Sequence, residues 1–245
     1  MGVTYVCEAL RCLRSVRRAR RDGSAPFILR PWNWPRPMFT HTTTQILDSL
    51  RQGENAEMWR LFDARYRPVV TAFSRRRGLA EQDAEEVAQQ TLAHFVTDFA
   101  AGRYERSRGR LSSYIMGIAS HRISDVHRRR AQQAGSRGES ILAELAGPAE
   151  GPASAGASGG AEDAEWSQAQ QRVILERALD LLRHSSRLDP RTVLAFELCT
   201  LRGVPAAAAA QECMMSIAEL YVAKNRALKK LRELIAELTL EFDEP

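Results

Sequence analysis

Apolar residues recur along this chain with the 3.6-residue period of α-helices, whereas the strict alternation typical of strands is absent. In the first half, the period predicts four helices, over 43–52, 55–77, 81–100 and 110–131. In the second half, it predicts four more, over 166–186, 190–202, 205–212 and 216–240. Gly78 and Gly102 follow predicted helix ends, where a left-handed residue is favoured, and Gly203 with Pro205 separates two helices. We therefore predict an all-α protein.

The two groups of helices are separated by a segment without this periodicity. Residues 139–166 carry six acidic residues, no basic residue and two Gly-Pro pairs. Such a composition buries too little apolar surface to order itself, so we predict a flexible linker between two small helical domains. The expected organisation is a disordered basic arm over 1–41, a domain over 42–132, an acidic Gly/Ala/Ser linker over 133–165 and a second domain over 166–241. Met38 is a plausible alternative start.

Charge favours a polyanionic partner. The formal net charge is +5 at a pI near 9.3, and 32 of the 35 basic residues are arginine, although genomic base composition is another source of that bias. No apolar run reaches the roughly 18 to 20 residues of a membrane span, and the N-terminus has no apolar secretory segment. The four cysteines lack the spacing of a zinc site or a disulfide framework. These features predict a cytoplasmic protein without a metal.

The helix predicted over 81–100 has two distinct faces. Its apolar stripe, expected to face the core, consists of Ala84, Val87, Ala88, Leu92, Phe95, Val96 and Phe99. The opposite stripe consists of Asp83, Glu86, Gln90 and Thr97, with Gln89 beside it. Acidic residues in a first turn also suit the helix dipole, so a solvated face and a docking face fit this stripe equally well.

The helix predicted over 110–131 presents small polar residues outward. This stripe consists of Ser113, Gly117, Ser120, Ser124 and Arg128, with His121 alongside. Arginines lie on both sides of it in the sequence, at 103, 106, 108, 110 and 128–130. A closely approachable backbone flanked by arginines suits a nucleic-acid strand, with Tyr104 and Tyr114 as stacking surfaces or, alternatively, as half-buried packing residues. Arg122 falls on the apolar stripe, and we expect it to pair with Asp125.

The segment 190–232 has the order of elements of a helix-turn-helix: a helix, a Gly-Val-Pro break, a short helix, a tight connection and a long basic helix. Ser216 is the expected N-cap of that helix. Its expected buried stripe consists of Ile217, Leu220, Ala223, Ala227, Leu228, Leu231 and Leu234. Its outward residues are Val222, Asn225 and Lys229, flanked by Tyr221, Arg226 and Arg232.

These motifs resemble those of one bacterial family. The segments 83–92 (DAEEVAQQTL), 108–111 (RGRL) and 113–122 (SYIMGIASHR) resemble the second conserved domain of sigma factors of the extracytoplasmic-function group. The segments 203–205 (GVP) and 222–232 (VAKNRALKKLR) are similar to the fourth domain of the same group, although Cys213-Met214 stands where Leu-Gly is usual. The two resemblances occur in the family's order, with a linker between them.

The resemblance implies a transcription initiation subunit without a catalytic residue or cofactor. Its contacts with core RNA polymerase would be made by Asp83, Glu86, Val87, Gln89 and Gln90. Its contacts with the −10 promoter element would be made by Arg110, Ser113, Tyr114, His121, Arg128 and Arg129. Its contacts with the −35 element would be made by Ser216, Tyr221, Val222, Asn225, Arg226 and Lys229.

The implied partners are core RNA polymerase and promoter DNA, with an anti-sigma factor as a further candidate, and we expect the free protein to be monomeric and independent of membranes. Two other classes of protein fit the residues. One is a helix-turn-helix regulator that binds DNA as a dimer without polymerase, and the other is a helical adaptor that holds a partner protein. An enzyme is not expected, because the sequence has no paired carboxylates, activated nucleophile, metal cluster or Gly-rich phosphate loop.

Overall fold

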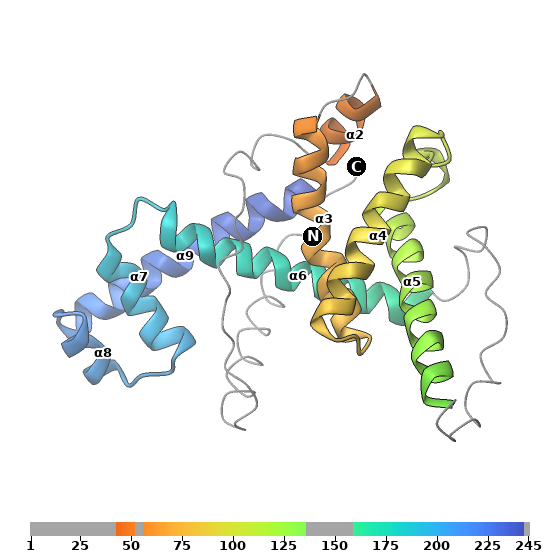
Figure 1. The fold of residues 1–245 in the computed structure, drawn as a ribbon. Helices are drawn as coiled ribbons and strands as arrows, with labels where there is room; N and C mark the ends of the chain where they lie inside the picture. Colours follow the sequence, from red (N-terminus) through yellow and green to blue (C-terminus); the bar gives the residue numbers. More distant parts are fainter. Residues whose placement is uncertain (1–42, 52–55, 136–158, 243–245) are drawn as a thin grey trace. The chain divides into compact units, whose positions relative to one another are not determined.

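The computed structural model describes residues 43–51, 56–135 and 159–242, and all regular elements among these residues are helical (Figure 1). The predicted all-α class is confirmed. The α-helices are α2 (Thr43–Arg51), α3 (Ala56–Arg76), α4 (Glu81–Ala100), α5 (Leu111–Gly135), α6 (Gly159–His184), α7 (Pro190–Phe196), α8 (Ala206–Glu212) and α9 (Ile217–Phe242). A 3-10 turn, η2 (Arg106–Arg108), precedes α5, and a π-helical turn, η4 (Glu197–Leu201), continues α7.

The helix bounds agree with the apolar period for most elements, and α4 has the predicted limits. The exception is α6, which begins at Gly159 rather than at residue 166 and therefore includes the end of the segment expected to be a linker. The N-terminal arm expected over 1–41 and the part of the linker over 136–158 lie outside the described residues.

The described residues divide into two compact units, 43–173 and 174–242. In the first unit, α3, α4 and α5 pack on one another around an aromatic core. The rings of Phe62 on α3 and Phe95 on α4 stack with centroids 4.9 Å apart, and Tyr104 packs edge-on to Phe95 at 5.8 Å. This packing brings the two helices with candidate binding residues, α4 and α5, side by side.

The second unit contains the rest of α6 with α7, η4, α8 and α9. One group of buried residues joins the end of α6 to α9 and includes Leu182, Phe196 and Leu231. A second group, which includes Leu198, Ala209 and Leu220, joins η4 and α8 to the start of α9. The side chain of Asp189 accepts a hydrogen bond from the amide of Arg191 (2.7 Å), and with Pro190 this cap starts α7.

Within the predicted apolar stripes, two residues do not lie in the core. Val96 on α4 is 36% exposed, and Ile217 on α9 is 50% exposed. Val96 lies on the edge of its stripe, and Ile217 lies in the first turn of α9, where the neighbouring helices do not cover it. Periodicity identifies the side of a helix that faces the core, but it does not show how far the neighbouring helices extend over that side.

The turn between α8 and α9 contains a non-glycine residue with a positive φ. Gly78 and Gly102 have φ angles of 87° and 68°, as expected for residues after helix ends. Met214 adopts a φ of 53°, in the left-handed region that favours glycine. Its side chain is 73% exposed, so little packing offsets the steric cost of this conformation.

We predict that Met214→Gly stabilises the protein. Removing the Cβ relieves the left-handed backbone, and the gain exceeds the loss of an exposed side chain by about 0.5 to 1 kcal/mol in free energy of unfolding. Urea unfolding followed by circular dichroism measures this change. Met214→Ala is the control, because it also shortens the side chain but keeps the Cβ, and it should give no gain. Equal stabilisation by both variants would contradict a backbone origin.

Candidate nucleic-acid interface

The polar stripe of α4 is accessible along most of its length. Glu86 and Gln89 are exposed, Asp83 and Gln90 are partly exposed, and the amide of Gln90 donates a 2.8 Å hydrogen bond to Glu86. Val87 differs from these residues because it is buried, with 1% of its surface exposed. Four of the five residues predicted to contact polymerase therefore form a surface, and Val87 lies beneath it.

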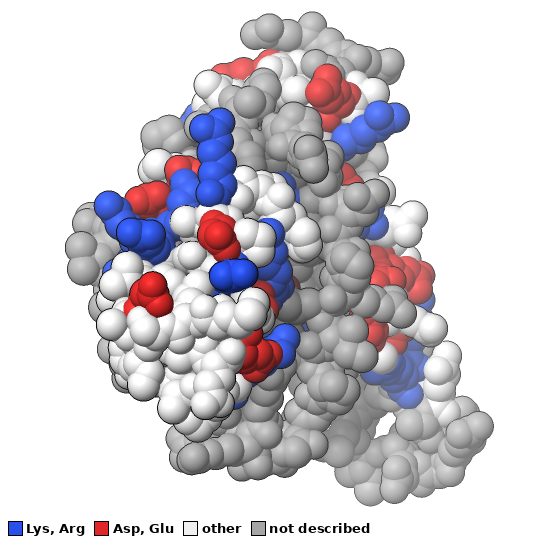
Figure 2. All heavy atoms as spheres, turned by 90° about the vertical axis from the view of Figure 1, so that its left-hand side faces the viewer, with Lys and Arg blue, Asp and Glu red and all other residues white. Residues whose placement is uncertain are grey.

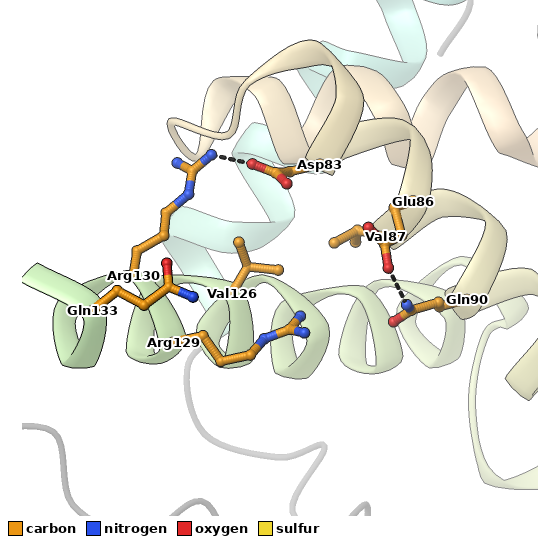
Figure 3. A pocket seen from close by; sticks show the side chains of 8 residues that line it. All are labelled: Asp83, Glu86, Val87, Gln90, Val126, Arg129, Arg130 and Gln133. Atoms are coloured by element: carbon orange, nitrogen blue, oxygen red, sulfur yellow. Dashed lines mark hydrogen bonds and ion pairs between the residues drawn. The ribbon is translucent and has the colours of Figure 1, made fainter.

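A cleft of about 190 Å³ separates this stripe from the second half of α5 (Figure 3). Its lining comes from α4 and α5 and consists of Asp83, Glu86, Val87, Gln90, Val126, Arg129, Arg130 and Gln133. Arg130 forms an ion pair with Asp83 across the cleft. The cleft thus brings four residues predicted to bind polymerase close to Arg129, which is predicted to bind the −10 element.

The beginning of α5 is held by a buried carboxylate of α4. Asp98 is 2% exposed and accepts hydrogen bonds from the Tyr114 hydroxyl (2.7 Å) and from Arg103 Nε (2.8 Å). His94 Nε2 lies 3.5 Å from the same carboxylate. Burial, together with the hydrogen bond to Asp98, raises the pKa of the Tyr114 phenol to about 12. Asp98 is thus a positioning residue that was not predicted from the sequence, because a single acid near the end of a helix has no distinctive pattern.

Tyr114 is half-buried rather than fully available for stacking. Its ring packs edge-on to Tyr104, with centroids 5.3 Å apart, and to Phe95 at 6.1 Å. Tyr104 itself is only 4% exposed. Tyr104 is therefore a packing residue, in agreement with the alternative interpretation. Of the two tyrosines, only Tyr114 has an accessible part.

The other residues predicted to contact the −10 element lie at the surface. These exposed residues are Arg110, Ser113, His121, Arg128 and Arg129. They lie along the accessible side of α5 and just before it, with arginines near both ends of the polar stripe. This arrangement can bind a phosphate chain along the helix.

The prediction of an ion pair between Arg122 and Asp125 is wrong. Asp125 lies 3.6 Å from Arg128, which is on the same side of α5. The Nη2 group of Arg122 lies 3.4 Å from His94 Nδ1 on α4 and donates toward it. Spacing along one helix could not reveal this partner on another helix.

In the second unit, α9 begins with a capping box. The hydroxyl of Ser216 accepts a hydrogen bond from the amide of Glu219 (3.2 Å), and the Glu219 carboxylate accepts one from the amide of Ser216 (2.8 Å). The hydrogen bond from the Ser216 amide, together with one from its hydroxyl, lowers the pKa of Glu219. The predicted N-cap is confirmed, so Ser216 has a structural role in addition to any contact with DNA.

The outward face of α9 is exposed as predicted. Its accessible residues are Tyr221, Val222, Asn225, Arg226 and Lys229. Met214, just before α9, and Ile217, in its first turn, are also exposed apolar residues. Figure 2 shows the side of the molecule that carries α8, where Lys and Arg side chains lie next to a broad uncharged area. Along this face of α9, Tyr221 and Val222 come first in the chain, and the basic residues Arg226 and Lys229 follow.

No group of three or more potential metal ligands lies together in the part of the chain that the structure describes. In the same part, no helix is both long and apolar enough to cross a membrane. Neither Cys199 nor Cys213 forms a disulfide.

Residues 62–133 match the family model for Sigma-70 region 2. The match covers less than a third of the chain and extends from α3 to the second half of α5. No curated protein matches the chain. The match supports a sigma factor of the sigma-70 family, with a role in promoter recognition and transcription initiation. Sigma-70 region 2 in general binds core RNA polymerase and promoter DNA.

We predict that Tyr114→Phe destabilises the protein by about 1 to 3 kcal/mol at neutral pH, because it removes a hydrogen bond to a buried carboxylate. Urea unfolding measures this loss. Tyr221→Phe is the control, since Tyr221 is exposed on α9, and it should change the free energy of unfolding by less than about 0.5 kcal/mol.

The difference in free energy of unfolding between the wild type and Tyr114→Phe should depend on pH. The folded pKa of Tyr114, about 12, lies above the ordinary value of 10.0, so its stabilisation is complete below pH 10 and is lost as the pH rises through 12. The stability difference between the wild type and Tyr114→Phe should therefore shrink above pH 10. A difference that stays constant up to pH 11.5 would show that the phenol does not depend on Asp98.

Proposed function

We propose that the protein is a sigma factor of the extracytoplasmic-function group, which binds core RNA polymerase, directs it to specific promoters and helps to open the −10 element. The observation that carries this proposal is the match of residues 62–133 to Sigma-70 region 2, because it spans the two helices with accessible polar faces. The chain would act as a subunit, without a catalytic site or cofactor of its own.

Docking on polymerase is assigned to the polar stripe of α4. Asp83, Glu86, Gln89 and Gln90 are accessible on a helix whose opposite side is packed in the core, so they present a rigid surface. Val87 would contribute by packing beneath this surface against the cleft. An acidic surface of this kind suits a basic partner and supports the orientation of binding.

Contact with the −10 element is assigned to α5 and to the arginine that precedes it. Arg110, Arg128 and Arg129 supply positive charge near both ends of the helix, and Ser113 and His121 supply polar groups between them. Because strand opening exposes unstacked bases, the accessible part of Tyr114 would provide a stacking surface. Asp98 would keep that ring in place through its hydrogen bond with the phenol.

Contact with the −35 element is assigned to α9 in the second unit. The exposed face with Tyr221, Val222, Asn225, Arg226 and Lys229 has the chemistry of a major-groove reader. Ser216 would contact the DNA near the start of the helix while it also caps that helix. An anti-sigma factor is a further partner of the kind that the proposed group suggests, and the free protein is proposed to be a cytoplasmic monomer.

We predict that reversing Asp83 and Glu86 to lysine abolishes co-elution of the protein with core RNA polymerase in size-exclusion chromatography. Both side chains lie on the proposed docking face, and the reversal replaces attraction by repulsion. Glu85→Lys is the control, because Glu85 is an exposed acid of α4 that lies toward Arg67 of α3. Unchanged co-elution of the double variant would mean that these acids form only a solvated surface.

We also predict different effects for residues along α9. Asn225→Ala and Arg226→Ala should each relax the preference for −35 sequences, because a bidentate contact with a base discriminates by about 1 to 3 kcal/mol. Lys229→Ala should weaken binding to all promoters about equally. It should also lower the slope of log affinity against log salt concentration by up to about one. Selection from randomised −35 sequences measures the preference. If the first two variants select the same sequences as the wild type, α9 is not the reader.

A further inference from the structure

Within the first unit, the acidic beginning of α6 packs against α3. Trp166 is buried, with 4% of its surface exposed, and its ring lies edge-on to Phe73 of α3 with centroids 5.5 Å apart. Ala169 and Val173, on the same side of α6, are also buried. The side-chain carbonyl oxygen of Gln168 accepts a hydrogen bond from Arg76 at the end of α3. This apolar anchor holds the acidic residues of the first turns of α6 in defined positions.

Two of these acidic residues converge on one arginine. Arg77 Nη1 lies 2.9 Å from Glu162 and 3.5 Å from Glu165. The hydroxyl of Ser120 on α5 donates a 3.3 Å hydrogen bond to the other oxygen of the Glu162 carboxylate. Arg77 and Glu162 are about one quarter exposed, so this contact is partly shielded from water. The guanidinium of Arg77, which directly follows α3, and a hydroxyl from α5 thus bind one anionic group together.

The position of Ser120 gives this contact its significance. Ser120 belongs to the small polar stripe of α5, between Gly117 and Ser124, along which a nucleic-acid strand is proposed to lie. An arginine beside a hydroxyl is also a common arrangement for binding the phosphates of a DNA backbone. A carboxylate carries the same sign of charge and accepts the same hydrogen bonds as a phosphate.

We propose that Arg77 and Ser120 form a binding site for a phosphate of promoter DNA, and that Glu162 and Glu165 occupy this site until DNA displaces them. This inference rests on the proposed function, since it adds a contact and its regulation to the −10 face. The beginning of α6 then acts as an intramolecular competitor that lowers the affinity for DNA. Partly exposed ion pairs are weak, so promoter DNA can exchange with the carboxylates.

The first experiment measures promoter binding by the complex of the full chain with core RNA polymerase, using fluorescence anisotropy of labelled promoter DNA. Glu162→Gln should tighten binding by about three- to tenfold, because it removes the competing charge. The control is Asp163→Asn, which removes one charge from an exposed neighbour on the same helix and should change the affinity by less than twofold. An equal gain from both variants would overturn the proposal, because general repulsion would then account for it.

The second experiment tests the arginine. Arg77→Ala should weaken promoter binding and lower the slope of log affinity against log salt concentration by about one. When it is combined with Glu162→Gln, the gain in promoter affinity from Glu162→Gln should disappear. Arg75→Ala is the control, because Arg75 is exposed on the same end of α3 and lies only at 4.0 Å from Glu81. If the combined variant binds DNA as tightly as Glu162→Gln alone, Arg77 is not a phosphate ligand.

These outcomes separate the two proposals. If the wild-type complex does not bind promoter DNA at all, the proposed function fails. If the wild type binds but Glu162→Gln has unchanged or weaker affinity, the ion pair only fastens α6, and the competition is refuted. Circular dichroism of each variant verifies that the helices remain folded.

Discussion

A buried carboxylate at the end of α4 determines the arrangement of the first unit. Asp98 is almost inaccessible, and an unpaired charge in this position would destabilise the fold by several kcal/mol. It is paired by Arg103 from the following loop and by Tyr114 from α5, with His94 beside it. Because these partners lie on both sides of η2, one ionised group fixes the loop and the beginning of α5 against α4.

A second feature of this unit is that groups proposed to bind partners are already paired with each other. Asp83, on the proposed polymerase face, pairs with Arg130 of α5, and Arg77 pairs with Glu162 of α6. Binding of polymerase or DNA would therefore exchange internal ion pairs for external ones. Both pairs remain partly accessible to water, and since accessible pairs contribute only about 0 to 1 kcal/mol, these exchanges cost little. Polymerase docking at α4 would also release an arginine next to the DNA-binding face of α5.

Much of this fold could be predicted from local patterns. The 3.6-residue apolar period, the glycines that follow helix ends and the N-cap at Ser216 all depend on residues near one another in the chain. The limits of α4 and the exposed face of α9 are of this kind. Contacts between different elements could not be predicted: Asp98 is bound by Arg103 of the following loop and by Tyr114 of α5, and Arg122 reaches His94 on another helix. The early start of α6 depends on the packing of Trp166 on Phe73, which composition does not reveal. The polymerase and DNA contacts of individual residues remain predictions.

Reconstituted run-off transcription tests the central claim most directly. Core RNA polymerase, genomic promoter fragments and the purified protein are combined, and the products are resolved by length. The account predicts discrete transcripts that require the protein. The absence of such transcripts, with the protein binding the same fragments equally well without polymerase, would contradict it and would indicate a helix-turn-helix regulator instead.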